Sequence, residues 1–322
     1  AEAREHATTL YLPERVVPMF PLVLAAGPMS LRVGEVCAAL SFAVLLEADG
    51  RVAEVQLHAS RIRPTQRLTY EEADALLVQE TPHPLQRLAH WAQVRTRYRT
   101  ARGAISLALP ELNIKVRGDT PVLNLLQDTP SRQMVAEMMI LVGDCVGQYG
   151  LQHQLPLPYR QQPQPNLPSA TELNALPDSW LQSLAMRRCM PPSTFVVLPS
   201  PEVQAVPHAS LGLSAYVQAT SPIRRYTDLL THYQLKAHLR GVAPPLDAAT
   251  LETIVQQAGA RMREATLVER QTKRYWLLEH IRLAGERLWE AVWVRWLRQD
   301  EDLCLILLPE LASEFVMRRR EG

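Results

Sequence analysis

Apolar residues recur three or four positions apart along much of the chain, which is the spacing of helices with one buried face. Asp247 is a good capping residue for the longest of these stretches, and Thr129-Pro130 opens another. Helices are predicted over residues 1–9, 70–78, 84–100, 130–150, 180–189, 222–241 and 248–287.

Strand patterns occupy the intervals between these helices. Residues 36–46 and 51–62 are rich in strand-forming residues and are joined across Asp49-Gly50, which is a strong hairpin signal. Residues 103–109 predict a further strand, which we expect to pair with residues 113–116. Residues 154–170, rich in proline and glutamine, read as a connecting segment.

The last part of the chain changes from helical to alternating apolar spacing. Val292, Val294 and Trp296 alternate with polar residues, and a second apolar run covers residues 303–307. This period predicts two or three strands. We therefore place a boundary between residues 1–287 and residues 288–322.

Two glutamates interrupt apolar helix faces. Glu137 is flanked by Met134, Ile140 and Leu141, and Glu269 lies on the apolar stripe of the long helix. A buried carboxylate without a partner is costly, so each glutamate needs one. An arginine fits both positions, and a water bound to a metal also fits Glu269.

Residues 221–226 combine a helix start with an unusual charge. Ser221 is a good N-cap, and Pro222 suits the first helical position. Arg224 and Arg225 then fall in the first turn, where the helix dipole is already positive. Together with the Ser221 hydroxyl they form a receptor for phosphate. The alternative is a solvated first turn in which Asp228 offsets one arginine.

Composition limits the classes of function. The chain has 322 residues with a net charge of +1, so any attraction to nucleic acid must be local. Its four cysteines lack a CxxC or zinc spacing, and we expect reduced thiols in a cytoplasmic protein. We also expect no membrane span, since no apolar run approaches roughly 20 residues.

The sequence from residue 219 to residue 230, ATSPIRRYTDLL, resembles the signature of the RNB family of exoribonucleases, the RNase II and RNase R type. The resemblance extends to residues 11–31 and to the approach to the signature. It implies 3′ to 5′ hydrolysis of single-stranded RNA to 5′-nucleoside monophosphates with Mg²⁺, in RNA decay and processing. No protein partner is implied.

The resemblance also assigns roles to individual residues. Arg224 is expected to stabilise charge on the scissile phosphate, and Glu269 to orient solvent or to partner the arginine. Tyr11 is expected to stack on a base, as aromatic faces do with single strands. The other expected contacts to substrate come from Tyr70, Glu137, Ser221 and Arg225. Of these, Tyr70 and Glu137 are expected to read the ribose. Without the resemblance, Tyr11 and Tyr70 would be read as packed tyrosines.

The implied architecture is α+β, with a mixed or antiparallel sheet covered by helices around an RNA channel. Residues 1–287 would form most of the RNB catalytic domain, and residues 288–322 the beginning of an OB-type RNA-binding barrel. The family binds Mg²⁺ through an aspartate-rich motif that precedes the Tyr-Leu-Pro segment, so we expect those ligands upstream of Ala1 and assign none within the chain.

Two other functions stay open at this point. The chain could be a non-catalytic RNA-binding relative or fragment that keeps the RNA channel without metal ligands. It could also be a scaffold domain in which the arginine helix has no nucleic-acid role.

Overall fold

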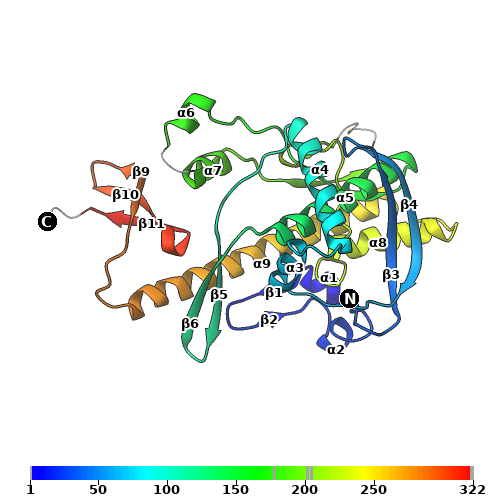
Figure 1. The fold of residues 1–322 in the computed structure, drawn as a ribbon, viewed down its shortest axis with the longest axis horizontal. Helices are drawn as coiled ribbons and strands as arrows, with labels where there is room; N and C mark the ends of the chain where they lie inside the picture. The colour runs from blue at the N-terminus through cyan, green and yellow to red at the C-terminus, as the bar shows by residue number, and fades with distance from the viewer. Residues whose placement is uncertain (1, 177–178, 201–202, 204–205, 320–322) are drawn as a thin grey trace.

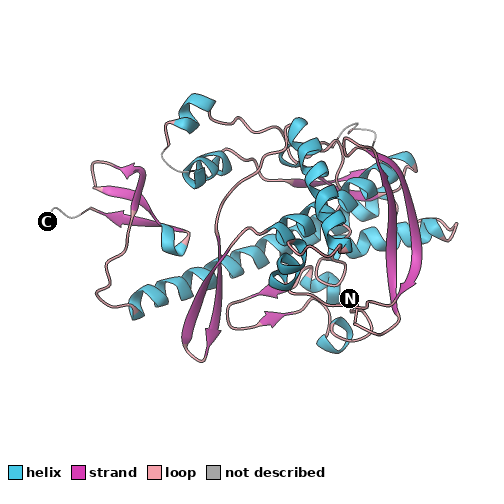
Figure 2. Ribbon diagram, in the orientation of Figure 1, coloured by secondary structure: helices cyan, strands magenta, loops and turns pink. Residues whose placement is uncertain are grey.

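The computed structural model describes residues 2–176, 179–200, 203 and 206–319, and shows an α+β fold (Figures 1 and 2). Its helices are α1 (Glu2–His6), α2 (Leu22–Ala25), α3 (Tyr70–Leu77), α4 (Pro84–Ala101), α5 (Pro130–Gln152), α6 (Ala170–Asn174), α7 (Ser179–Arg188), α8 (Tyr226–Leu239) and α9 (Ala248–Leu283). Its strands are β1 (Leu10–Tyr11), β2 (Val16–Val17), β3 (Cys37–Leu46), β4 (Val52–Ile62), β5 (Glu111–Arg117), β6 (Thr120–Leu126), β7 (Leu157–Gln161), β8 (Thr194–Leu198), β9 (Val292–Arg298), β10 (Leu303–Leu308) and β11 (Ser313–Arg318).

The strands form small antiparallel sheets rather than one large sheet. β1–β2, β3–β4, β5–β6 and β7–β8 are two-stranded, and the C-terminal sheet has the order β11-β10-β9. Helices α3, α4 and α5 pack against one another, and α5 also contacts β4, whereas α9 packs against α1, α8 and the strands β1, β5, β6, β7 and β8. The predicted α+β class and the C-terminal strands are confirmed.

The main core lies where α5 meets β7 and α8. Leu157, Tyr159, Val217 and Leu235 are fully buried there. The glycines of α5 allow this close approach, because a Cβ at Gly147 would lie 3.0 Å from the backbone carbon of Ala215. This core fixes the segment that leads into the signature.

Helix α9 connects the main body to the C-terminal sheet (Figure 1). Its N-terminal half buries Leu251 and Val255 against β8, as expected for an amphipathic helix. Its C-terminal end buries Leu277 in a separate cluster with Ile114 and Ile306. The middle of α9 therefore lies between two hydrophobic clusters, and one of its faces lines a cavity.

Several sequence-based boundaries are wrong. Residues 103–109 form no strand, because β5 pairs with β6, its hairpin neighbour. The segment predicted as a connector contains β7, which pairs with β8. α1 ends at His6 because Ala7 adopts a left-handed backbone conformation with φ 58°. The predicted Asp247 cap of α9 is confirmed, but the helix ends at Leu283.

Helix α5 is long and apolar enough to cross a membrane by length and composition alone. Half of its apolar window is buried inside the protein, however, and it carries the buried carboxylates Glu137 and Asp144. A core helix of a globular domain meets the same criteria. The four cysteines are all free, as expected.

Candidate functional site

The signature forms a tight turn that precedes α8. The backbone N–H groups of Arg224 and Arg225 donate to the carbonyl of Ser221, and the N–H of Ser221 donates to Oδ2 of Asp228 at 2.9 Å. The helix begins only at Tyr226, so the expected N-cap at Ser221 and the placement of both arginines in its first turn are wrong.

Residues 7–11, which include β1 and are called the N-terminal strand, explain the late start of α8. The N–H of Thr9 and the hydroxyl of Thr8 both donate to the carbonyl of Arg224, at 3.0 Å and 3.1 Å. The N–H of Tyr226 donates to the carbonyl of Ala7. This long-range pairing holds Arg225 in an extended conformation and overrides the local Ser-Pro preference for a helix.

The two neighbouring arginines differ in their surroundings. A terminal nitrogen of Arg225 lies 2.7 Å from Oδ2 of Asp228, whose side chain is fully buried. The Nε of Arg225 is buried and has no hydrogen-bond partner among the described residues. Arg224 is half-buried, and its guanidinium makes no hydrogen bond or ion pair with any described residue. Asp228 thus offsets Arg225, as the solvated-turn alternative expected, but leaves the charge of Arg224 uncompensated.

Glu269 is linked to Tyr11 by a hydrogen bond. Its Oε1 accepts from the backbone N–H of Tyr11 at 2.6 Å. Glu269 is half-buried rather than central in a buried stripe, and its partner is a backbone amide instead of an arginine. Tyr11 is 46% exposed, so it is accessible to a ligand.

The N-terminal strand therefore brings three of the expected residues into one neighbourhood. It pairs with the backbone of Arg224 at Thr9 and is held by Glu269 at Tyr11, two residues later. Main-chain hydrogen bonds connect the signature turn to residues 7–9, and the Glu269 carboxylate connects β1 to the middle of α9, which gives this neighbourhood a defined geometry.

Tyr70 and Glu137 lie where α3 and α4 pack on α5. Tyr70 is 37% exposed, and the Arg132 guanidinium lies 4.2 Å from its ring centroid. Its carbonyl accepts a hydrogen bond from the hydroxyl of Ser131. Glu137 and Arg132 both line a cavity of about 860 Å³ between α5 and β6. Tyr70 does not line this cavity itself, and is linked to it through Arg132.

Glu137 is a buried structural carboxylate. Its Oε1 lies 2.9 Å from Nε of Arg99, and its Oε2 accepts from the hydroxyl of Thr96. Arg95, also fully buried, lies 3.9 Å from Oε1 and pairs with Asp144 at 2.8 Å. The expected arginine partner is confirmed. Arg95 and Arg99 both belong to α4 and are buried, although arginines on a helix more often face solvent.

Tyr216 stands between the Glu137 cluster and the signature, and sequence reasoning did not select it. Its ring packs on Gly143 of α5, where a Cβ would come within 2.1 Å of Cε2. Burial raises the pKa of Tyr216, and the charge of Arg225 is the largest opposing influence. The phenol therefore stays protonated near neutral pH. Its position immediately before the signature was the available signal.

Arg160 and His208 flank Tyr216 and were also missed as site residues. The rings of His208 and Tyr216 lie edge to face at 5.7 Å. Burial, assisted by the charge of Arg160, lowers the pKa of His208 to about 4. Burial likewise lowers the pKa of Arg160, and Arg225 adds to this effect. The site thus gathers positive charge around a buried phenol.

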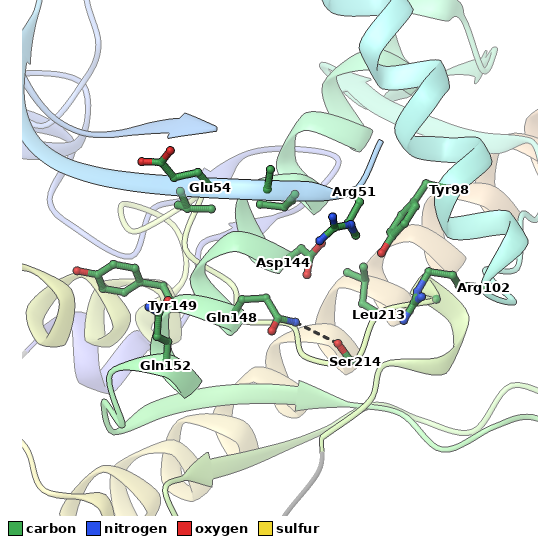
Figure 3. A pocket seen from close by; sticks show the side chains of 14 residues that line it. Arg51, Glu54, Tyr98, Arg102, Asp144, Gln148, Tyr149, Gln152, Leu213 and Ser214 are labelled. Atoms are coloured by element: carbon green, nitrogen blue, oxygen red, sulfur yellow. Dashed lines mark hydrogen bonds between the residues drawn. The ribbon is translucent and has the colours of Figure 1, made fainter. Parts of the chain in front are cut away.

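A separate cavity of about 460 Å³ lies between β4, the end of α4 and the second half of α5 (Figure 3). Arg51, Arg102 and Asp144 point toward its centre (Figure 3). Arg51 pairs with Glu47, and Asp144 pairs with the buried Arg95. Acids balance the arginines here, so this cavity lacks the uncompensated charge found at the signature.

No group of three or more His, Cys, Asp or Glu side chains suited to a metal ion occurs among the described residues. The residues present do not make a Mg²⁺ site. The described residues of the site support the binding of an anion at Arg224 and of a flat aromatic group at Tyr11.

Two ribonucleases are similar to this chain in sequence. An uncharacterized ribonuclease of Synechocystis sp. is 49% identical over 98% of this chain and 47% of its own length. The chloroplastic/mitochondrial ribonuclease II of Arabidopsis thaliana is 39% identical over 87% of this chain and 35% of its own length. The chain thus spans about half, or less, of these relatives.

Solved structures share the fold. RNase R of Mycoplasma genitalium, in complex with ribose-methylated single-stranded RNA, gives a TM-score of 0.82 at 20% identity over 97% of this chain and 55% of that one. An active-site mutant of the Dss1 exoribonuclease of Candida glabrata gives 0.83 at 22% identity over 98% and 43%. Yeast Ssd1, a pseudonuclease, gives 0.77 at 18% identity over 98% and 43%.

These structures confirm the expected RNB-type fold. The model of the RNB domain matches residues 1–241, which include the N-terminal strand, the Glu137 cluster and the signature turn. The chain therefore belongs to the RNB family.

Proposed function

We propose that this protein is an exoribonuclease that hydrolyses single-stranded RNA in the 3′ to 5′ direction and releases 5′-nucleoside monophosphates, in RNA decay and processing. The observation that carries the proposal is the unpaired guanidinium of Arg224 on a turn held by the N-terminal strand. A half-buried cation without a counterion favours the arrival of an anion, and the scissile phosphate supplies one.

The neighbouring residues receive roles consistent with their contacts. Tyr11 stacks on a base near the 3′ end, because its ring is exposed beside the turn. Glu269 positions Tyr11 through the main-chain hydrogen bond. Arg225 and Ser221 shape the turn through Asp228. Each acts on the end of the strand, where exonucleolytic cleavage takes place.

Recognition of ribose is assigned to the α3–α5 side of the site. Tyr70 is 37% exposed, and a contact from its side chain to the 2′-hydroxyl would distinguish RNA from DNA. Glu137 contributes through the cavity that it lines, since its oxygens are already bonded to Arg99 and Thr96.

Mg²⁺ is proposed as the cofactor from the family resemblance alone. The described residues provide no cluster that would hold it. We therefore assign no step of the reaction to the metal in this chain, and we restrict the roles above to binding and positioning.

The test is degradation of a 5′-labelled single-stranded RNA with added Mg²⁺, compared with the same reaction in EDTA. We expect mononucleotides as the released product and a ladder that shortens from the 3′ end. R224A should abolish this activity, whereas R240A should retain it, because Arg240 lies at the far end of α8. Release of oligonucleotides from internal cuts would contradict the proposal.

A second candidate is an RNA-binding protein without catalytic activity. It is favoured by one observation, namely that no group of three or more potential metal ligands occurs among the described residues. Binding of single-stranded RNA that depends on Arg224 and Tyr11, with no mononucleotide release under any metal condition, would establish this alternative over the first.

A further inference from the structure

A cavity of about 750 Å³ lies between β8, the preceding residues 192–194 and one face of α9. The face of α9 that lines it includes Gly259, Arg263 and Arg270. Arg160, which borders the signature site, lines its other side. The volume falls within the range of pockets for small ligands, roughly 300–1,000 Å³.

Arg160 is a cation without a counterion at the inner wall of this cavity. Its guanidinium lies 4.6 Å from the centroid of the Phe195 ring and donates to the hydroxyl of Ser193. It pairs with no carboxylate among the described residues. Burial disfavours the charged form of Arg160 and lowers its pKa. The like charge of Arg225 repels Arg160 and lowers its pKa further. An incoming anion relieves both costs.

Two further arginines face the same space. Arg263 lies over Gly259, with a terminal nitrogen 3.6 Å from where a Cβ would stand. Neither Arg263 nor Arg270 makes an ion pair within the described part of the chain. The acid that lines the cavity, Glu252, accepts from Gln256 at 3.3 Å. Three arginines against one glutamate leave an excess of positive charge.

The remaining wall combines apolar residues with the polar side chains of Ser193, Thr194, Gln256 and Thr266. Phe195 and the buried Val255 form its base, and Met262 and Leu267 form its outer rim. Leu267 is 55% exposed, so it presents apolar surface at the mouth of the cavity. A ligand that presents a flat apolar surface at one end and an anion at the other matches this wall.

The cavity lies close to the signature, and this position further limits the class of ligand that fits it. The backbone N–H of Arg160 donates to the carbonyl of Tyr216 at 2.8 Å, so this end of the cavity adjoins the segment that leads into the signature. Arg270 follows Glu269 directly in α9. The signature turn and the cavity therefore lie next to each other along both Arg160 and α9.

We propose that this cavity binds a nucleoside 5′-monophosphate, with the phosphate held by Arg160 and Arg263 and the base against the apolar rim. The inference rests on the proposed function, of which this nucleotide is the product. It adds a holding site for the leaving product, distinct from the turn where the strand end binds.

The experiment measures binding of AMP to the protein at equilibrium by titration calorimetry, without RNA or turnover. Inorganic phosphate and adenosine are titrated in parallel. We expect R263Q to weaken AMP binding by about 10- to 100-fold, as loss of a charge-assisted contact does. R261Q is the matched control, because Arg261 is on the same helix but donates to the carbonyl of Arg4 on another face.

The outcomes separate this proposal from the proposed function. Weaker AMP binding in R263Q but not in R261Q supports the site even if the protein cleaves no RNA. Undetectable AMP binding, or equal binding in R263Q and the unmodified protein, overturns it even if RNA is degraded. Phosphate bound as tightly as AMP overturns the nucleotide assignment. If R263Q weakens the binding of a single-stranded oligonucleotide by the same factor as the binding of AMP, the cavity is part of the path of the RNA strand. That result overturns the assignment of a separate product site.

Discussion

Oε1 of Glu269 lies 2.6 Å from the backbone nitrogen of Tyr11, although the two residues are 258 positions apart. This contact ties the middle of α9 to a two-residue strand that has few other main-chain partners. A carboxylate that accepts from a main-chain N–H fixes the backbone and leaves the tyrosine ring free. The orientation of Tyr11 therefore depends on Glu269.

Replacing Glu269 should weaken RNA binding through Tyr11. We expect E269A to lower the affinity for a short single-stranded RNA by about tenfold, the effect of one hydrogen bond to a charged group. E269Q keeps an acceptor oxygen and should lose less. Fluorescence anisotropy with labelled RNA measures both, and E264A is the control, since Glu264 is an exposed residue of the same helix. Equal losses in E269Q and E269A would contradict a positioning role.

Alanine substitutions of the two adjacent arginines of the signature should have different effects, R224A on activity and R225A on stability. R224A removes no hydrogen bond or ion pair to the described residues, so the free energy of unfolding should change by about 0.5 kcal/mol or less, while cleavage falls by roughly 100-fold or more. R225A leaves the buried Asp228 without its partner and should cost about 3–5 kcal/mol. Urea unfolding and RNA degradation are measured on both variants. A large loss of stability in R224A would falsify this distinction.

The buried pair of Arg99 and Glu137 should be strongly coupled. A double-mutant cycle with R99A, E137A and the double variant should give a coupling energy above about 1 kcal/mol, because each single change strands a buried charge. The surface pair of Arg282 and Glu279 provides the control cycle, and its coupling should be smaller because solvent screens both charges. Unfolding free energies in urea give both values. Similar couplings in the two cycles would argue that the Glu137 pair is solvated.

Two glycines in helices should respond oppositely to alanine. G143A pushes a methyl group against the ring of Tyr216 and should destabilise the protein by about 1–3 kcal/mol. G259A meets only Arg263, at 3.6 Å, and should stabilise it by up to about 1 kcal/mol through helix propensity. Thermal unfolding monitored by circular dichroism compares the two. The tyrosine emission of G143A should also change if Tyr216 moves.

The low pKa of His208 should make stability depend on pH. Its folded-state pKa of about 4 lies below the usual value of 6.5, so the unfolded chain binds the proton more tightly. The contribution of His208 is present above pH 6.5 and is lost as the pH falls from 6.5 to 4, by up to about 3 kcal/mol. Urea unfolding from pH 7.5 to pH 4 measures the loss. H208Q should flatten the profile over that window, and an unchanged slope would rule out His208 as its source.

The sequence located most of the helices and much of the chemistry. Periodicity placed α4, α5 and α9 because one apolar face per helix is visible in a local window. The same reasoning showed that Glu137 needed an arginine, since an isolated carboxylate cannot lie on an apolar helix face. The family resemblance added the signature, whose composition alone left phosphate binding and a solvated turn equally open.

The errors came from contacts between distant residues. Ser221 and Pro222 favour a helix start locally, but pairing with the N-terminal strand delays the helix to Tyr226. β7 was missed because its partner β8 lies more than thirty residues later in the chain. Local propensities amount to less than about 1 kcal/mol per residue, so long-range hydrogen bonds and packing override them.

The sequence by itself determined the family, the α+β class and the residue types from which the site is built. Only the tertiary structure decided which of two adjacent arginines is paired, that Glu269 holds the backbone of Tyr11, and that Arg160 faces a cavity without a counterion. The physical reason is that charge compensation depends on distances of a few ångströms between segments far apart in sequence, and these distances are set by packing.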